Sequence, residues 1–538
     1  MRNYLVLLLA AAASANLASA GALHAREVAR DLKHYNNARD MSADKNRIEK
    51  RYPPNRETFI PTTTPVWMAS QTPAATSTST TTQAAGNPTT TPAPSGQFAT
   101  PTSRALVAAT TSSATTCAPP YFAPTTIAGT GTLPKPTGFV RKRANRGQEL
   151  VGDGNQRYVI VGPNMYWLCQ DENYGPVGSY TDKARVREAL AIAVAMGANT
   201  IRVLSCGISV GPNNPYNLEP GYQVFNQAAW DIRDYVLYAA REYGLRVIMT
   251  MVDNYDYYHG GKYDFIDFRR ASRANSGYAF YQNRAVQNAY GWYIQQFLLH
   301  VNAYTGVEYR NDPTILAWET GNELGGYINA EAWPPTQWTT AIIKFISAYD
   351  TNHMIIDGTN GTTNMSSYRR THLTFHFFLF FAFPPFRRRP PGFWNYTNNA
   401  ISPGLSNRGI DIVTDHGYPR NTGILNREIA YASQYFKGFF IGEYDWTSTN
   451  SAVSLDTYIA LIETQANYLG DMIWNVMGHD PQCCAFVSHN DGYSLYYPNG
   501  NSAADQANAL KVVQHWYRVT GRAIPNQLPA VQCPQPVF

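Results

Sequence analysis

Short apolar runs alternate with amphipathic stretches from about residue 155 to the end of the chain. Most of these runs are bounded by polar or glycine residues and lack a regular apolar–polar alternation, which predicts strands buried on both faces, as in a parallel sheet. The expected strands are Tyr158–Val161, Asn164–Leu168, Asn199–Leu204, Arg246–Val252, Thr314–Thr320, His353–Asp357, Asp411–Thr414, Phe439–Gly442 and Asp471–Val476. Placing the first barrel strand near Met165 leaves out Tyr158–Val161 and makes the other eight runs the strands of one closed sheet.

Between these runs, apolar residues recur every three or four positions, the spacing of helices that bury one face. Two of these stretches are followed by Gly197 and Gly244, and glycine favours helix termination. The expected helices are Asp182–Met196, Ala228–Tyr243, Ala289–Tyr304, Thr336–Tyr349, Leu425–Phe436, Leu455–Tyr468 and Ala503–Val519. The alternation predicts an α/β protein, with a (β/α)8 TIM barrel formed by residues 138–538.

The residues before the barrel differ in composition. Residues 1–20 have a basic start, an apolar centre and a small-residue end, which predicts a signal peptide and a secreted, extracellular protein. Residues 21–137 are polar and then rich in Ser, Thr and Pro, so we expect a disordered tether that cannot form a packed core. No later stretch is long and apolar enough to predict a membrane span, and we expect no membrane partner.

One segment interrupts the barrel pattern. Residues 361–391 contain the apolar run THLTFHFFLFFAFPPF followed by three arginines, and exposed apolar sequence is a liability in a secreted protein. Because Phe, Leu, Pro and Ser codons can be pyrimidine-rich, one hypothesis is a retained intron, whose removal joins Asn360 to Gly392. The alternative is a genuine inserted loop.

Positive and negative charges are distributed unevenly. Residues 1–149 contain 16 Lys and Arg against 7 Asp and Glu, and residues 361–391 contain five Arg and no acidic residue. Because the whole chain has a net charge of +5, the remaining residues have a net charge of −9. An acidic, aromatic-rich body suits a neutral polymer better than a polyanion, so we expect no nucleic-acid partner.

Six cysteines are present, without the C-x-x-C spacing of a metal site. In a secreted protein some of them are expected to form disulfide bonds. Cys169 and Cys206 lie near the ends of neighbouring predicted strands, which favours them as a pair.

Two glutamates follow apolar runs that are far apart in the sequence. Glu323 lies after Thr314–Thr320 in WETGNEL, and Glu443 lies after Phe439–Gly442 in FFIGEYDWT. Catalytic groups of such barrels lie at the C-terminal ends of the strands, so the two carboxylates should converge. A pair of carboxylates is the equipment for cleaving a glycosidic bond: one protonates the leaving oxygen, and the other attacks the anomeric carbon.

Further polar and aromatic residues lie at predicted strand ends. Arg202 can keep a nearby carboxylate ionised, and the Tyr418 hydroxyl can orient Glu443. We therefore expect a lowered pKa for Glu443 and a higher pKa for Glu323. The residues expected to bind substrate are Trp167, Arg202, Asn254, Asn322, His416, Tyr418 and Trp474. The two tryptophans are expected to stack on sugar rings, and the amide of Asn322 to hold a sugar 2-hydroxyl.

As a set, these residues resemble glycoside hydrolase family 5 over about residues 145–525. The matching positions are Arg202, Asn322-Glu323, His416-x-Tyr418, Glu443 and Trp474. The resemblance implies a barrel with the glutamates on strands four and seven, with Glu323 as the acid/base and Glu443 as the nucleophile. The text YWL near the first strand and DNYDYYHGGKY after the third are similar to fungal endo-β-1,4-mannanases, which implies β-1,4-mannan as the substrate.

The chain departs from the mannanase pattern at Asp253, where asparagine is usual, at Leu324, where proline is common, and directly after Glu443. Two alternatives therefore stay open: the same chemistry on a β-glucan or another β-hexosan, and a non-catalytic carbohydrate-binding wall protein on an inactive barrel. The presence of both glutamates argues against an inactive barrel. Two carboxylates suffice for the reaction, so we expect no metal, no cofactor, and a monomer whose partner is a polysaccharide.

Overall fold

A computed structural model describes residues 133–362 and 402–538 apart from short gaps. The gaps are residues 145, 177, 205, 207–213, 256–260, 326–333, 450–452, 466 and 536. The predicted signal peptide, almost all of the Ser/Thr/Pro-rich region and most of residues 361–391 lie outside the described residues.

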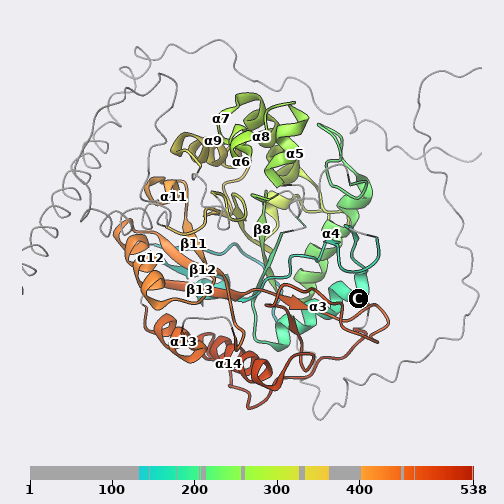
Figure 1. The fold of residues 1–538 in the computed structure, drawn as a ribbon, viewed down its shortest axis with the longest axis vertical. Coiled ribbons are helices and arrows are strands. Elements are labelled where there is room, and N and C mark those ends of the chain that lie inside the picture. The colour runs from blue at the N-terminus through green and yellow to red at the C-terminus, as the bar shows by residue number, and fades with distance from the viewer. Residues whose placement is uncertain are drawn as a thin grey trace, which may run out of the picture. The chain divides into compact units, whose positions relative to one another are not determined.

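Within the described residues, eight parallel strands form one sheet that closes into a barrel (Figure 1). Asn164 and Arg202 form a parallel bridge between the two end strands, and Met165 N donates to Arg202 O at 2.9 Å. In sheet order, the strands are β4 (Ile160–Pro163), β13 (Tyr468–Ile473), β12 (Gly438–Tyr444), β11 (Ile412–Gly417), β10 (Met354–Asp357), β9 (Ile315–Glu319), β8 (Arg246–Thr250) and β7 (Thr200–Val203). The predicted barrel is confirmed, but its first strand is β4 and not a strand near Met165.

Helices surround the strands (Figure 1). The helices at predicted positions are α3 (Lys183–Ala195), α4 (Gln227–Tyr243), α8 (Arg284–Leu299), α9 (Thr336–Ser347), α12 (Thr422–Gln434), α13 (Leu455–Thr464) and α14 (Ala503–Val519). The shorter helices that the sequence pattern did not predict are α5 (Gly261–Phe268), α6 (Ala274–Gly277), α7 (Ala279–Gln282), α11 (Pro403–Ser406), η3 (Asp153–Asn155) and η4 (Tyr309–Asn311). Among the described residues, no helix combines the length and apolarity needed to cross a membrane.

Helix ends follow local sequence signals. The side chain of Asn226 accepts a hydrogen bond from Ala228 N at the start of α4, and Gly244, at φ 74°, ends this helix as predicted. Gly197 follows α3 at φ 92°. These local signals explain why the boundaries of α3 and α4 lie within one residue of the predicted ones, whereas α8 begins and ends five residues before the predicted helix.

A small antiparallel sheet precedes the barrel, and the sequence pattern did not predict it. Its strands are β1 (Arg141–Arg143), β2 (Arg146–Val151) and β3 (Arg157–Tyr158). Val140 and Leu150 pack with Ile160, Phe440 and other inward-facing barrel residues in one apolar cluster. The lower part of the barrel interior is thus a packed core. Two further two-stranded sheets pair β5 (Gln170–Asp171) with β6 (Ser179–Tyr180) and β14 (Val476–Met477) with β15 (Leu495–Tyr496).

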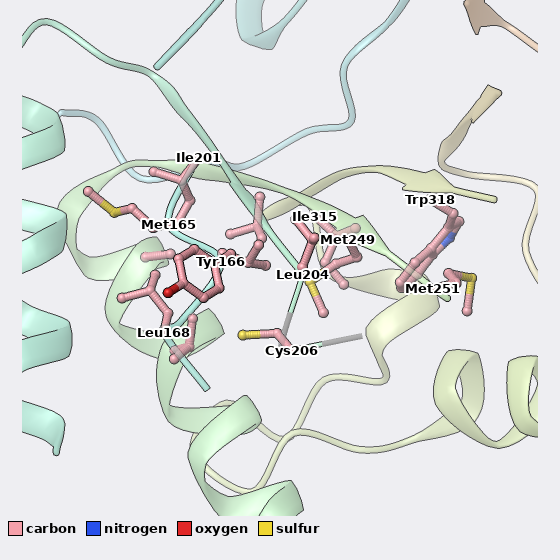
Figure 2. Packing of buried hydrophobic residues seen from close by; sticks show 14 of the residues in the cluster. Met165, Tyr166, Leu168, Ile201, Leu204, Cys206, Met249, Met251, Ile315 and Trp318 are labelled. Carbon is pink, nitrogen blue, oxygen red and sulfur yellow. The ribbon is translucent and has the colours of Figure 1, made fainter. Parts of the chain in front are cut away.

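Alternation along the strands separates an apolar outer layer from a polar upper interior. Figure 2 shows Ile201, Met249 and Trp318 within the apolar packing of the larger cluster. Side chains of neighbouring residues in a strand point to opposite faces, so Arg202 and Glu319 point into the barrel. The inward positions near the C-terminal strand ends are therefore polar.

Between described residues, two disulfide bonds tie loops of the barrel together. The predicted pair Cys169–Cys206 is confirmed, and a second bond joins Cys483 to Cys533. The first bond joins the chain after β4 to the chain after β7, which are neighbouring strands of the closed sheet.

The chain on the two sides of residues 363–401 meets in the loop after β10. Ser402 N donates to Thr362 O at 2.8 Å, and Thr362 donates to the Glu428 carboxylate through both its N–H and its hydroxyl. Gly361 lies beside Asp415 at φ 82°. Residues 361 and 362, which the intron hypothesis assigns to the removable segment, thus contact the barrel.

Replacing residues 364–400 with a short Gly-Ser linker should leave the barrel folded. The barrel already holds Thr362 and Ser402 together, and loop-closure entropy depends only weakly on loop length. We expect the Tm, measured by calorimetry, to change by less than about 5 °C. Loss of the cooperative transition would show that the replaced residues are part of the core.

Candidate active site

The barrel brings Glu323 and Glu443 together at the C-terminal ends of the strands. One ligand atom each of Glu323, Glu443 and His416 lies within 4.8 Å of the other two. His416 Nδ1 lies 2.7 Å from Glu323 Oε1 and 3.5 Å from Glu443 Oε2. The two carboxylates thus approach the same nitrogen of one imidazole and are close enough to act on one bond.

A β-bulge at Gly442 turns Glu443 into the barrel. The pairing of β12 with β11 skips Gly442, between the pairs made by Ile441 and Glu443. Phe440 packs in the barrel interior, so strict alternation would point Glu443 outward, and one extra residue reverses this direction. A side chain at position 442 would come within 2.6 Å of Thr414 Oγ1, so the bulge requires glycine.

Glu323 lies four residues beyond the end of β9, in the left-handed region at φ 49°. A parallel bridge between Asp253 and Asn322 holds the chain before it, and a bridge between Leu324 and Thr359 holds the chain after it. A non-glycine residue in this conformation is strained, and such strain is found where surrounding structure imposes it, often at functional sites. The loop geometry thus fixes the direction of the Glu323 carboxylate.

Arg202 is the centre of the hydrogen-bond network and is 0% exposed. Its Nη1 donates to Glu443 Oε1 at 2.7 Å and to Asn164 Oδ1 at 2.9 Å. Its Nη2 donates to Asn322 Oδ1 at 2.8 Å, and its Nε donates to Glu319 Oε2 at 2.8 Å. One guanidinium therefore orients Glu443 and the asparagine that precedes Glu323.

The pKa directions of the two glutamates are opposite to those expected from the sequence. Burial raises the pKa of Glu443, and the charges of His416 and Arg202 offset this only in part. Burial also acts to raise the pKa of Glu323, but the hydrogen bonds from His416 and Tyr255 and the charge of His416 outweigh it, so the pKa is lowered. The expectation from the sequence rested on the charge of Arg202, whereas the burial of Glu443 and the imidazole next to Glu323 decide the directions.

Burial acts to lower the pKa of His416, but the two glutamate charges and the hydrogen bond to Glu323 raise it above its ordinary value. At pH values below 6.5, His416 is therefore protonated in the site without substrate, and its Nδ1 lies 2.7 Å from Glu323 Oε1. Because His416 and Arg202 contact the two carboxylates directly, hydrogen bonds and ion pairs account for the close approach of these groups.

The other polar residues expected to bind substrate form hydrogen bonds with protein groups in the site. Tyr418 donates to Glu443 Oε2 at 3.2 Å. The amide of Asn322 lies between Arg202 and Asp253, because its Nδ2 donates to Asp253 Oδ1 at 3.0 Å. Asn254 is buried, and its Oδ1 accepts a hydrogen bond from Lys262 at 2.6 Å. Binding of substrate by these residues stays a prediction.

The two tryptophans, Trp474 and Trp167, differ in their exposure to solvent. Trp474, directly after β13, is half-buried, stacks on Tyr166 at a centroid distance of 5.2 Å, and donates to Asp491 Oδ2 at 2.7 Å. Trp167 is 0% exposed and donates to Val476 O at 2.9 Å. The expectation that Trp167 stacks on a sugar is therefore wrong for this structure, because the ring is a core residue out of reach of a ligand.

Sequence reasoning missed three residues of the network. Tyr255 donates to Glu323 Oε2 at 2.8 Å, Asn164 accepts from Arg202, and Glu319 shares Arg202 with Glu443. Tyr255 belongs to the DNYDYYHGGKY motif, and Glu319 and Asn164 lie at strand ends. Position at a C-terminal strand end, which indicated Glu323 as a site residue, could therefore have indicated Glu319 and Asn164 as well. The sequence does not show which side chain forms a hydrogen bond with each of these three residues.

Comparison with known proteins agrees with this geometry. The family model described as GH family 5 beta-mannosidase-like matches residues 138–378, which include Glu323 but not Glu443. The chain is 31% identical over 288 residues to mannan endo-1,4-beta-mannosidase 1 of Oryza sativa subsp. japonica, covering 52% of this chain and 59% of the relative. It is 28% identical over 283 residues to mannan endo-1,4-beta-mannosidase 1 of Arabidopsis thaliana, covering 53% and 61%. The matched part thus spans about three fifths of these curated relatives.

Solved structures share the fold. The endo-1,4-beta-mannanase from Rhizomucor miehei aligns with a TM-score of 0.53 at 20% identity, covering 72% of this chain and 100% of that structure. The endo-beta-1,4-mannanase from Thermotoga petrophila aligns with a TM-score of 0.52 at 21% identity, covering 69% and 78%. By the family model and the curated relatives, the matched part of this chain is similar to the mannanase-like glycoside hydrolases of family 5.

Proposed function

We propose that the protein is a secreted retaining endo-glycosidase that hydrolyses β-1,4-mannan. The observation that carries the reaction type is the approach of Glu323 and Glu443 oxygens within 4.8 Å. Retaining enzymes hold their two carboxyl groups about 5–5.5 Å apart, whereas inverting enzymes need about 6.5–9.5 Å to admit a water molecule. The names of the curated plant relatives support mannan as the substrate.

In the first step, the Glu443 carboxylate attacks the anomeric carbon while protonated Glu323 gives its proton to the leaving oxygen. The glycosidic bond breaks and a covalent glycosyl ester with Glu443 forms. In the second step, ionised Glu323 takes a proton from water, whose oxygen attacks the same carbon and releases Glu443. Two inversions leave the first product in the β configuration.

His416 supplies the proton that Glu323 needs. Without substrate, the raised pKa of His416 and the lowered pKa of Glu323 place the proton on the imidazole. The 2.7 Å hydrogen bond from Nδ1 to Glu323 Oε1 is the route by which substrate binding moves that proton to the carboxyl group. Arg202 and Tyr418 meanwhile hold Glu443 in position for attack.

The activity should follow a bell-shaped pH profile. Glu443 must be ionised, and its pKa is raised above the ordinary 4.5, so kcat/KM should fall as the pH drops through a value above 4.5. The proton shared by His416 and Glu323 must be present, and the pKa of His416 is raised above 6.5, so kcat/KM should fall again above that pH. Initial rates on an aryl β-mannoside across the pH range test this. Full activity about one pH unit below 4.5 would contradict the assignment.

A panel of polysaccharides tests the substrate. We expect release of mannooligosaccharides from β-1,4-mannan and slower hydrolysis of β-1,4-glucan, with internal cleavage seen as a rapid fall in viscosity. Preferential hydrolysis of β-glucan would favour the alternative β-hexosan hydrolase, and binding without hydrolysis would favour a carbohydrate-binding wall protein. N-terminal sequencing of protein from culture medium tests secretion, for which the sequence of residues 1–20 is the support.

A further inference from the structure

A third buried carboxylate lies beside Arg202. Glu319, the last residue of β9, is 0% exposed. Its Oε2 accepts hydrogen bonds from Arg202 Nε at 2.8 Å and from the Thr250 hydroxyl. Within the described part of the chain, its Oε1 is buried without a hydrogen-bond partner. Because Glu319 is fully buried, it acts on catalysis through its neighbours, and of these Arg202 also contacts Glu443.

Arg202 carries one positive charge and contacts two carboxylates. Its Nε faces Glu319, and its Nη1 faces Glu443 at 2.7 Å. The two bonds come from different nitrogens of a planar group, so Glu319 fixes the plane in which Nη1 reaches Glu443. A negative charge on Glu319 also offsets part of the positive charge of Arg202. Arg202 therefore stabilises the ionised form of Glu443 less than it would if Glu319 were neutral, and Glu443 stays more basic.

We propose that Glu319 is a positioning residue for the nucleophile: through Arg202 it aims the guanidinium at Glu443 and keeps Glu443 basic enough to attack the anomeric carbon. The inference rests on the proposed role of Glu443. Nucleophilicity of a carboxylate rises with its basicity, so a neutral residue at position 319 should make Glu443 easier to ionise and slower to react.

The charged and titratable groups that face Glu443 come from three regions of the barrel. They are Arg202 from β7, Glu323 after β9, His416 from β11, and Tyr418 directly after β11. None of them is changed by replacing Glu319 with glutamine, which also keeps an oxygen that can accept from Arg202 Nε. A shift in the pH profile of this variant therefore reports the charge of Glu319.

The test compares Glu319→Gln with the wild-type enzyme on an aryl β-mannoside. We expect the acidic limb of kcat/KM to move to lower pH by about one unit and kcat at the optimum to fall about ten-fold. Glu319→Asp, which withdraws the carboxylate by one methylene, should shift the limb in the same direction by less. It also supplies the test if the glutamine variant does not fold.

The matched control is Asp171→Asn, because Asp171 forms another buried arginine–carboxylate ion pair, with Arg185, at side-chain exposures of 1% and 0%. This variant should lower the Tm without moving the acidic limb. An acidic limb that stays in place or rises in folded Glu319→Gln overturns the inference and leaves the proposed function standing. A wild-type enzyme without glycosidase activity would overturn both.

Discussion

Glu443→Ala should lower kcat on an aryl β-mannoside by at least about 10⁴-fold while the protein stays folded, because no covalent intermediate can form. Alanine removes one of two carboxylates bound to Arg202, and Glu319 and Asn322 still satisfy the guanidinium. The barrel should therefore keep its cooperative unfolding transition in calorimetry.

Azide distinguishes loss of the nucleophile from general damage. The small anion can enter the space left by the Glu443 side chain and attack an activated aryl mannoside from the same side. The product should be the α-mannosyl azide, formed by a single inversion. A folded Glu443→Ala enzyme that azide does not rescue would count against Glu443 as the nucleophile. Glu242→Ala, which changes a surface ion pair with Lys135, is the control and should retain wild-type kcat.

Glu323→Gln should slow hydrolysis of mannan by about 10³-fold or more, because an alkoxide leaving group needs a proton. An aryl mannoside with a strongly acidic phenol needs no proton in the first step. On that substrate the variant should release a rapid burst of phenol and then turn over slowly, because water lacks its general base. Stopped-flow absorbance measures the burst.

Two outcomes would overturn the assignment of Glu323. One is equal slowing of the first step for good and poor leaving groups. The other is an α-configured first product from wild-type enzyme, seen by NMR early in the reaction. Tyr255→Phe offers a graded comparison, because it removes the 2.8 Å hydrogen bond to Glu323 but leaves the carboxyl group in place. It should slow mannan hydrolysis far less than Glu323→Gln.

Local signals in the sequence were enough to predict the barrel and the approximate position of its site. Seven of the expected strands overlap β7 to β13, because fully buried parallel strands are continuous apolar runs. The expected strand Tyr158–Val161 overlaps β4, yet the first barrel strand was placed near Met165, because the run after Asn164 is equally apolar. In that case the sheet pairing, which no local pattern contains, decided between two similar runs.

The sequence by itself determined which residues lie at the C-terminal strand ends, and hence that Glu323, Glu443 and Arg202 come together. Only the tertiary structure decided their directions and partners. The bulge at Gly442 reverses the alternation that would have turned Glu443 outward. Burial and the shared imidazole of His416 set the pKa directions against the sequence expectation. Strand position depends on local hydrophobicity, whereas the orientation and charge of a buried group depend on neighbours brought from distant parts of the chain.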